Sequence, residues 1–217
     1  MSTRVVVVDY GMGNLYSVCR ALEHVGAEAV LTEDPRAVLD ADRVVLPGVG
    51  AFRDGMDELA RRGLDSALRE YGASNRAMLG ICLGMQMLFE TSEEFGQHRG
   101  LAIIPGHVRA IPATGADGKA HKIPHVGWSA VFPPPCAQWS GTLLEGTPEG
   151  TEFYFVHSYT AVPETQEFRL GDADYDGCTV SAAVRRRNVY GLQFHPEKSG
   201  PAGLKLLERF VSMNVNR

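Results

Sequence analysis

The sequence predicts an α/β fold with a largely parallel central sheet, helices on both faces and antiparallel strands added in the C-terminal half. Three stretches of the N-terminal half share one order: a short apolar run, a glycine-rich turn and a segment with apolar residues at helical spacing. Strands that are apolar throughout and alternate with helices are typical of parallel sheets covered on both faces. Beyond about residue 100 the pattern changes to short β-like runs separated by Pro- and Gly-rich turns.

The first unit begins with a strand in "RVVVVDYGMGN" and continues with a helix in "LYSVCRALEHVG", whose glycine is a helix stop signal. The second, "DRVVLPGVGAF", predicts a strand, a glycine loop and then a helix through Met56 and Leu59. The third, "RAMLGICLGMQMLFE", predicts a strand that ends near Ile81 and a helix with Met85, Leu88 and Phe89 on its apolar face. We expect the three strands to lie parallel in one sheet.

In the C-terminal half, "TEFYFVHSYTAV" and "CTVSAAVRRRNVYGLQFH" predict antiparallel strands that continue the sheet. The last segment, "AGLKLLERFVSMN", predicts a terminal helix that packs through Leu204, Leu207, Phe210 and Val211. Two stretches, "PATGADGKAHK" and "FPPPCAQW", are expected to be flexible loop insertions. Because neither divides the chain into halves with independent cores, we expect one domain over residues 1–217.

Composition narrows the function classes. The chain has 217 residues, of which 44% are hydrophobic and 22% charged, as in ordinary globular proteins. Its formal net charge of -5, without a basic stripe, argues against nucleic-acid binding. The four cysteines (Cys19, Cys82, Cys136 and Cys178) lack CxxC or CxxH spacing, so a disulfide framework or zinc cage is not expected. With no signal-peptide core and no membrane-length apolar run, the expected location is the cytoplasm.

Cys82 is the first candidate catalytic residue. A free cysteine is most often a small buried side chain, but "GICLGMQ" places this one between Gly80 and Gly84, after a strand and before a helix. This is the cysteine form of the nucleophile elbow, a tight turn that needs small neighbours and presents its side chain at the carboxyl edge of the sheet. The following helix N-terminus would favour the thiolate, which is the attacking species.

A base for this nucleophile is predicted in "QFHPEKS". Proline after His195 disfavours the α conformation and keeps the histidine extended, so Glu197 should lie on the same side and reach one imidazole nitrogen. A carboxylate there would fix the tautomer and stabilise the imidazolium. A surface turn with an incidental His and Glu is the competing interpretation. Four other histidines are candidates for the base, and no sequence pattern supports them: His24, His98, His107 and His121.

Two further interpretations concern the same residues. A zinc site made of Cys82, His195 and Glu197 is disfavoured, because neither the ligand set nor its spacing is typical of zinc. The glycines of "LPGVGAF" allow backbone N–H groups around Val49 and Gly50 to face an oxyanion, with the N–H of Leu83 as the second donor. A plain turn between strand and helix is the alternative for this loop.

In this order, "PGVG", "GICLGMQ" and "HPEKS" resemble the class I glutamine amidotransferases, a family with a Cys-His-Glu triad on a three-layer α/β fold. Within that class, "VVDYGMGNLYSV", "PGVGAFRDGM", "IPHVGWS" and "YFVHSY" resemble the glutaminase subunits of imidazole glycerol phosphate synthase, of histidine biosynthesis. The resemblance covers nearly the whole chain. It implies no cofactor and no metal.

The resemblance also implies residue roles. Cys82 would attack the side-chain amide of glutamine, and His195, oriented by Glu197, would protonate the leaving ammonia. Glutamine would be held by Gln86 and by backbone around Gly50, His157 and Ser158. The ammonia would pass to a (β/α)₈-barrel cyclase partner, which makes imidazole glycerol phosphate and AICAR, in a heterodimer. Residues facing that partner would be Asn14, Trp128 and Lys198.

Some alternatives stay open at this point. Ser129 stands where the family often has asparagine, and the loops at 113–121 and 133–139 look longer than usual. An amidotransferase for another synthase, such as the pyridoxal phosphate or anthranilate systems, fits the "DYGMGNLYS" and "PHVGW" segments less well. A non-catalytic regulatory subunit would be expected to lack a triad member, and a stand-alone hydrolase would need no partner-facing residues.

Overall fold

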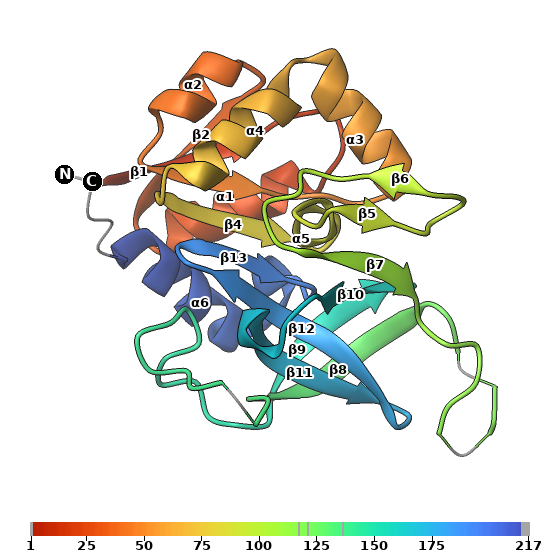
Figure 1. Ribbon diagram of the computed structural model, residues 1–217. Helices are drawn as coiled ribbons and strands as arrows, with labels where there is room; N and C mark the ends of the chain where they lie inside the picture. The colour runs from red at the N-terminus through yellow and green to blue at the C-terminus, as the bar shows by residue number, and fades with distance from the viewer. Residues whose placement is uncertain (1, 117, 121, 136, 214–217) are drawn as a thin grey trace.

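The computed structural model describes residues 2–116, 118–120, 122–135 and 137–213 (Figure 1). Its main element is a nine-stranded sheet. The strand order is β2 (Ala27–Thr32), β1 (Thr3–Val8), β3 (Arg43–Leu46), β4 (Ala77–Ile81), β13 (Val189–Leu192), β12 (Cys178–Arg186), β11 (Arg169–Tyr175), β8 (His125–Phe132) and β9 (Thr151–His157). The first five strands are parallel, and the last four are antiparallel.

The antiparallel additions confirm the expectation for the C-terminal half, with two differences. β13 pairs parallel with β4, so the end of "CTVSAAVRRRNVYGLQFH" returns to the parallel part of the sheet. The run "TEFYFVHSYTAV" is two strands that separate at Ser158. β9 stays in the main sheet, whereas β10 (Tyr159–Pro163) joins a smaller sheet of order β10, β7 (Gly106–Ala110), β5 (Thr91–Ser92) and β6 (His98–Arg99).

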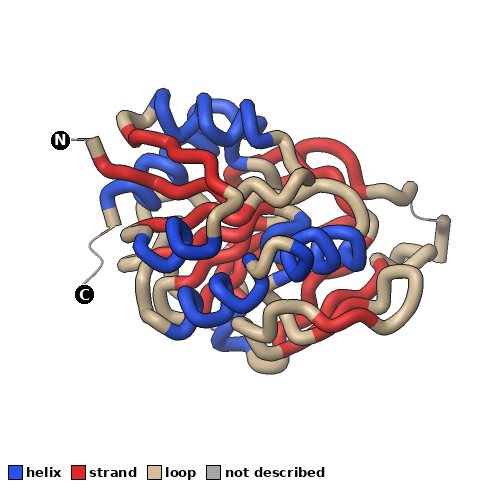
Figure 2. Tube along the Cα trace, turned by 90° about the horizontal axis from the view of Figure 1, so that it is seen from above, coloured by secondary structure: helices blue, strands red, loops and turns tan. Residues whose placement is uncertain are grey.

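Helices cover both faces of the main sheet, which gives the predicted three layers (Figures 1 and 2). One face carries α1 (Leu15–His24) and α6 (Gly200–Ser212), and the other carries α2 (Pro35–Asp40), α3 (Phe52–Arg61), α4 (Leu64–Ala73) and the short α5 (Leu83–Met87). Two 3₁₀ turns, η1 (Gln166–Phe168) and η2 (Pro196–Lys198), complete the described elements. Among the described residues, no helix is both long and apolar enough to cross a membrane.

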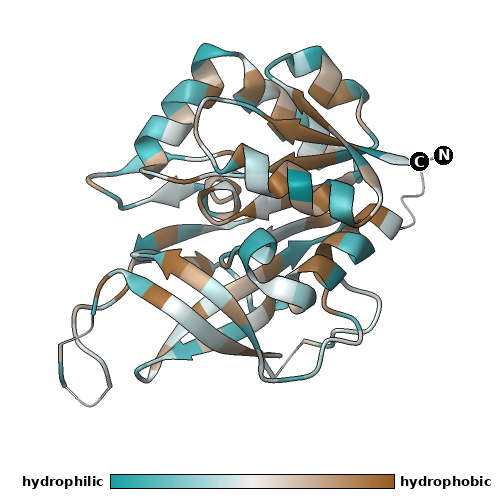
Figure 3. Cartoon of the chain, turned by 180° about the vertical axis from the view of Figure 1, so that it is seen from behind, coloured by the Kyte–Doolittle hydropathy of each residue, from teal (hydrophilic) through white to brown (hydrophobic). Residues whose placement is uncertain are grey.

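The apolar strands explain why two cores form. In β1, Val5 and Val7 point into the core beneath α1 and α6, while Val6 and Val8 point into the core beneath the other helices. Successive side chains of a strand face opposite sides, so a strand buried on both faces must be apolar at every position. Figure 3 shows these strands in brown between helices whose outer faces are largely teal. The valine run is therefore the sequence signature of the two-sided sheet.

Three sequence expectations were wrong in detail. The helix after Cys82 has only five residues and ends before Leu88, although Leu88 and Phe89 are buried as expected. In α6, Leu206 is fully packed while Leu204 lies at the margin of the core.

The third difference concerns the loop "FPPPCAQW", which is anchored at its end. The Trp139 side chain lies in the core and its Nε1 donates to Leu170 O at 2.7 Å. Cys136 and His121 lie outside the described residues.

α5 packs closely on the end of β3 at Gly84. A Cβ at Gly84 would lie 1.8 Å from the Leu46 carbonyl oxygen, which belongs to the backbone and cannot swing aside. We expect Gly84→Ala to lower the free energy of unfolding by about 3 kcal/mol or more. In Gly55→Ala, the matched control, the new methyl meets the flexible end of Met87 at 2.9 Å, and the helix gains propensity.

Urea unfolding of the two variants, followed by circular dichroism, measures both effects. Equal stability of Gly84→Ala and Gly55→Ala would contradict the backbone clash at Gly84.

Candidate active site

Cys82 occupies a strained turn between β4 and α5. Its φ of 53° and ψ of −111° lie in a region that residues with a Cβ rarely adopt and that costs about 1–3 kcal/mol. Two backbone hydrogen bonds hold this turn: Cys82 N donates to Leu192 O at 2.7 Å, and Gln86 N donates to Cys82 O at 3.1 Å. A Cβ at Gly80 would fall 2.7 Å from Gly84 O, so both glycines of "GICLG" are needed for the chain to reverse here. Cys82 itself is 7% exposed.

His195 and Glu197 form a buried pair beside this turn. The Nδ1 atom of His195 lies 2.7 Å from Oε1 of Glu197, and the two side chains are 2% and 1% exposed. The contact predicted from "HPE" is present, but the backbone conformation that produces it differs from the prediction. Residues Pro196–Lys198 form a 3₁₀ turn (η2) rather than an extended segment. Ser199 secures this turn, because its hydroxyl donates to His195 O at 2.7 Å and accepts from Tyr154 N at 3.0 Å.

The imidazole is tuned toward the charged form. Burial alone would lower the pKa of His195, but interactions with Cys82 and Glu197 outweigh it and raise the pKa to about 9. A carboxylate accepts only, so Glu197 holds the Nδ1 proton and leaves Nε2 for the side of the sulfur. That nitrogen is buried and makes no hydrogen bond with a described group. The arrangement favours an imidazolium beside the Cys82 sulfur.

A cavity of about 320 Å³ opens over the sulfur. It lies at the carboxyl ends of the parallel strands and brings together most of the predicted site residues: Cys82, His195, Val49, Gly50, Leu83, Gln86, His157 and Ser158. Glu197 stands behind His195 and does not line this cavity. Open α/β sheets bind ligands at this edge, and the volume suits a ligand of amino-acid size.

The glycine loop "PGVG" forms one wall of the cavity. The hydroxyl of Tyr10 donates to Pro47 O at 2.8 Å from beneath, and burial raises the pKa of this tyrosine, so it remains a donor. Gly50 has a φ of +104°, and Val49 is 40% exposed at the rim. At the first position of α5, the N–H of Leu83 has no intrahelical acceptor. These N–H groups are the candidates for an oxyanion site.

His157 is part of a buried hydrogen-bond chain. Its Nδ1 lies 2.7 Å from Tyr159 O, its Nε2 lies 3.0 Å from Nδ1 of His125, and Nε2 of His125 lies 2.8 Å from the Ser129 hydroxyl. Because a carbonyl only accepts, the proton of His157 must be on Nδ1; His125 then donates to it and accepts from Ser129. The serine that departs from the family pattern therefore closes this chain.

The two histidines of this hydrogen-bond chain, His125 and His157, are held neutral. Burial lowers the pKa of His157 to about 3, and burial also lowers the pKa of His125. His125 is further fixed by stacking on Phe155 and Tyr175, with ring centroids 5.0 and 4.0 Å apart. His157 therefore acts at the wall of the cavity as a rigid support, not as a proton donor or acceptor for chemistry.

Three residues that sequence reasoning did not single out are near the reactive centre. Glu94 lines the cavity and its Oε2 accepts from Phe52 N at 2.6 Å, at the start of α3. Gln193 contacts Cys82 Sγ, and His125 supports His157. The only sequence feature that pointed to a role for Gln193 is its position two residues before His195, in "QFHPE". No feature of the segment "ETSEEFG" predicts a role for Glu94.

The predicted partner-facing residues lie on the surface next to the triad. Trp128 is 53% exposed and packs edge-on against Tyr154, with centroids 6.1 Å apart. Lys198 is exposed, and its Nζ lies 6.0 Å from the centroid of the same tyrosine ring. Tyr154 thus joins Trp128 and Lys198. Asn14 lies at the start of α1, a helix that contacts η2.

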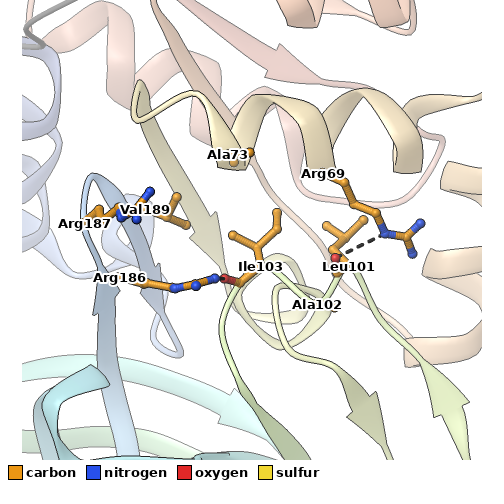
Figure 4. A pocket seen from close by; sticks show the side chains of 9 residues that line it. Arg69, Ala73, Leu101, Ala102, Ile103, Arg186, Arg187 and Val189 are labelled. Carbon is orange, nitrogen blue, oxygen red and sulfur yellow. Dashed lines mark hydrogen bonds between the residues drawn. The ribbon is translucent and has the colours of Figure 1, made fainter.

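A second cavity, of about 350 Å³, lies at the opposite edge of the sheet, near the start of β13 (Figure 4). Two of the three arginines that line it donate to backbone carbonyls. Arg69 donates to Gly100 O and Leu101 O at 2.9 and 3.2 Å, and Arg186 donates to Ile103 O at 2.5 Å. The N–H groups of residues 101–104 in turn bond to carbonyls at the end of α5. This region supports the helix that follows Cys82.

The other titratable groups do not form a site with the triad. His24 is exposed at the end of α1, and His98 and His107 lie half-buried in the small sheet. Within the described part of the chain, no three or more His, Cys, Asp or Glu side chains are grouped so as to hold a metal ion. The cavity and the pair behind it present a thiol, imidazoles, carboxylates and backbone N–H groups.

Comparison with known proteins identifies the family. The profile of the family described as "Glutamine amidotransferase class-I" matches residues 6–213. The chain belongs to this family. Among curated relatives, subunit HisH 1 of imidazole glycerol phosphate synthase from Legionella pneumophila (strain Paris) is 45% identical over 96% of this chain and 99% of its own length.

Two further comparisons agree. The HisH subunit of imidazole glycerol phosphate synthase from Syntrophotalea carbinolica is 48% identical over 96% of this chain and 100% of its own length. The solved structure of PurLQS from Thermotoga maritima matches with a TM-score of 0.70 over 98% of both chains, at 19% identity. At this level of identity, the match shows only that the two chains share a fold.

The neutral state of His157 predicts acid sensitivity. Between pH about 6.5 and about 3 the unfolded chain binds a proton at this residue that the native chain does not, so stability falls with falling pH by up to about 1.4 kcal/mol per pH unit. His195, whose native pKa is raised, opposes this trend only near the top of the window; below about pH 5.5 it is protonated in both states and contributes nothing. We expect His157→Asn to unfold with a shallower pH slope, whatever its stability at pH 7.

Urea unfolding at pH 7, 6, 5 and 4.5 measures this slope. His24→Asn, which removes an exposed histidine, is the matched control and should keep the slope of the unsubstituted chain. A wild-type slope in His157→Asn would show that this residue is not held neutral.

Proposed function

We propose that this chain is the glutaminase subunit of an imidazole glycerol phosphate synthase and that one amidotransferase domain spans residues 1–217. The observation that carries the proposal is the strained Cys82 turn beside the buried His195–Glu197 pair, at the base of a cavity of amino-acid size. The near full-length similarity to subunits named HisH supports the choice of synthase.

The first half of the reaction forms a thioester. The Cys82 thiolate attacks the side-chain carbonyl carbon of glutamine, and the oxyanion that develops is stabilised by backbone N–H groups of Leu83 and the Val49–Gly50 loop. The imidazolium of His195 gives its Nε2 proton to the leaving nitrogen, and the C–N bond breaks to release ammonia. A pKa of about 9 suits this step, because the group is charged at neutral pH before glutamine binds.

The second half regenerates the enzyme. His195, now neutral, takes a proton from a water molecule, whose oxygen attacks the thioester carbonyl. The C–S bond breaks, glutamate leaves and the sulfur returns as thiolate beside a charged imidazole. Throughout, Glu197 keeps the proton of Nδ1 in place, so that only Nε2 exchanges a proton with the reactants.

The cavity wall offers groups for both ends of an amino acid. Glu94 supplies a carboxylate suited to the α-ammonium group. The Gln86 nitrogen is turned toward Tyr159 O at 3.1 Å, which leaves Oε1 as the acceptor end of this side chain. Ser158, between β9 and β10, also lines the cavity, and its backbone N–H is the group we assign to the α-carboxylate. These contacts select a free amino acid with a side-chain amide.

The partner we infer is a cyclase subunit with a (β/α)₈ barrel, by analogy with the family. The cluster of Trp128, Tyr154 and Lys198 supports a docking face beside the triad. Because Lys198 follows Glu197 directly and Lys198 N donates to His195 O at 3.0 Å, a partner that binds this lysine acts on the backbone of the base.

Removal of the nucleophile tests the proposal most simply. With Cys82→Ala, we expect glutamine-dependent synthase activity to fall by on the order of 10⁴-fold or more, because no thioester can form. Activity with added ammonium salt should persist, since only the ammonia source is lost. Both rates are measured on the complex with a co-purified barrel cyclase.

Cys178→Ala serves as the control, as it removes a free thiol outside the cavity. Retained glutaminase activity in Cys82→Ala would overturn the nucleophile assignment. Failure of Cys82→Ala to co-elute with the cyclase in size-exclusion chromatography would point to a loss of assembly and not of chemistry.

A second prediction concerns coupling between the subunits. We expect Lys198→Ala to reduce the rise in glutaminase rate on binding of the nucleotide substrate to the cyclase by about 5-fold or more, while the basal rate is little changed. The reason is the direct backbone link from Lys198 to His195. Steady-state glutamate release at saturating cyclase, with and without nucleotide, measures the ratio.

Lys205→Ala, an exposed lysine on α6, is the matched control. If Lys198→Ala and Lys205→Ala are stimulated equally, Lys198 is an ordinary surface charge.

A further inference from the structure

A line of side-chain amides connects the backbone at the cavity wall to the nucleophile. Gln86 Nε2 donates to Tyr159 O at 3.1 Å and to Gln193 Oε1 at 3.0 Å. Gln193 Nε2 in turn lies 3.8 Å from Cys82 Sγ, within the range of a hydrogen bond to sulfur. Gln193 directly follows β13 and Gln86 lies on α5, so the line joins α5 to the strand whose Leu192 O accepts from Cys82 N.

One carbonyl sets the direction of every bond in this line. Tyr159 O can only accept, so the Gln86 atom beside it must be the amide nitrogen. The Gln193 atom that accepts from that nitrogen must then be its oxygen. This leaves the nitrogen of Gln193, with its N–H groups, facing the sulfur. The hydrogen-bond network therefore determines that the Gln193 side-chain nitrogen, and not its oxygen, faces the Cys82 sulfur.

Gln193 has little freedom to turn away. Its side chain is 0% exposed, and its backbone N donates to Ala182 O at 2.9 Å. A buried N–H gains more from a charged acceptor than from a neutral one, because hydrogen bonds to ionised groups are shorter and stronger. The amide thus favours the thiolate over the thiol at a position where water cannot take its place.

We propose that Gln193 is a further catalytic residue of the glutaminase reaction, donating an N–H to Cys82 Sγ, with Gln86 as the residue that positions it. The proposal rests on the proposed function. The proton that leaves the sulfur goes to Nε2 of His195, and Gln193 retains its own protons throughout. Its effect is to stabilise negative charge on the sulfur, both before attack and when the thiolate leaves at the end of the cycle.

Substitution by methionine tests the donor with little change of volume. In Gln193→Met we expect the pH at half-maximal rate of Cys82 alkylation by iodoacetamide to rise by about one unit, because a donor to the thiolate is lost. We also expect kcat for glutamine hydrolysis by the complex to fall about 10-fold or more with little change in KM, since Gln193 does not line the cavity. Gln97→Met, at an exposed position, is the matched control and should change neither value.

Two further readouts separate the possible failures. Co-elution of Gln193→Met with the cyclase in size-exclusion chromatography, together with its circular dichroism spectrum, reports whether the subunit folds and assembles. Absence of glutaminase activity in the unsubstituted complex would overturn the proposed function, whereas an unshifted alkylation profile in folded Gln193→Met would overturn the role of Gln193 alone.

The unsubstituted chain offers an independent measurement if the variant does not fold. In ¹⁵N-labelled protein, the assigned side-chain N–H signals of Gln193 should shift when iodoacetamide converts Cys82 to its neutral thioether. Signals that stay unchanged on alkylation would contradict the hydrogen bond.

Discussion

The structure depends on the closeness with which α5 packs on the end of β3. The absence of a side chain at Gly84 lets the helix lie against the Leu46 carbonyl, and only then can the chain turn at Cys82 with a φ of 53°. The turn puts the sulfur at the carboxyl edge of the sheet, and the same packing brings the N–H of Leu83 next to the loop that follows β3. The strain at Cys82 is offset by backbone hydrogen bonds to β13 and to α5.

Apart from His195, which Glu197 orients, the polar side chains along the cavity wall are oriented by a backbone carbonyl. Tyr159 O accepts from Gln86 and from His157, so a single acceptor fixes the amide line to the sulfur and the imidazole chain to Ser129. It is available because the chain leaves the main sheet at Ser158 and enters the small one. The break between β9 and β10 thus creates the cavity wall and also sets the polarity of the groups that support it.

Much of this could be predicted from the sequence, for physical reasons. The valine run of β1, the glycines around Cys82 and the His-Pro-Glu segment are local patterns with few structural solutions. The parallel pairing of β13, the shortness of α5 and the burial of Trp139 depend on contacts between distant segments, which no local pattern encodes. Gln193 was missed for the same reason: a buried glutamine acquires a role only when the fold places a sulfur in front of its amide.

The central claim is that Cys82, and no other thiol, is the nucleophile because the turn and His195 activate it. The most direct measurement is the site and stoichiometry of labelling by a diazoketone analogue of glutamine, read by mass spectrometry of peptides from the synthase complex. We expect one label per chain, on Cys82, prevented by excess glutamine, although Cys19 and Cys178 are more exposed. Labelling of either of these cysteines in place of Cys82, or labelling that glutamine does not prevent, would contradict the account.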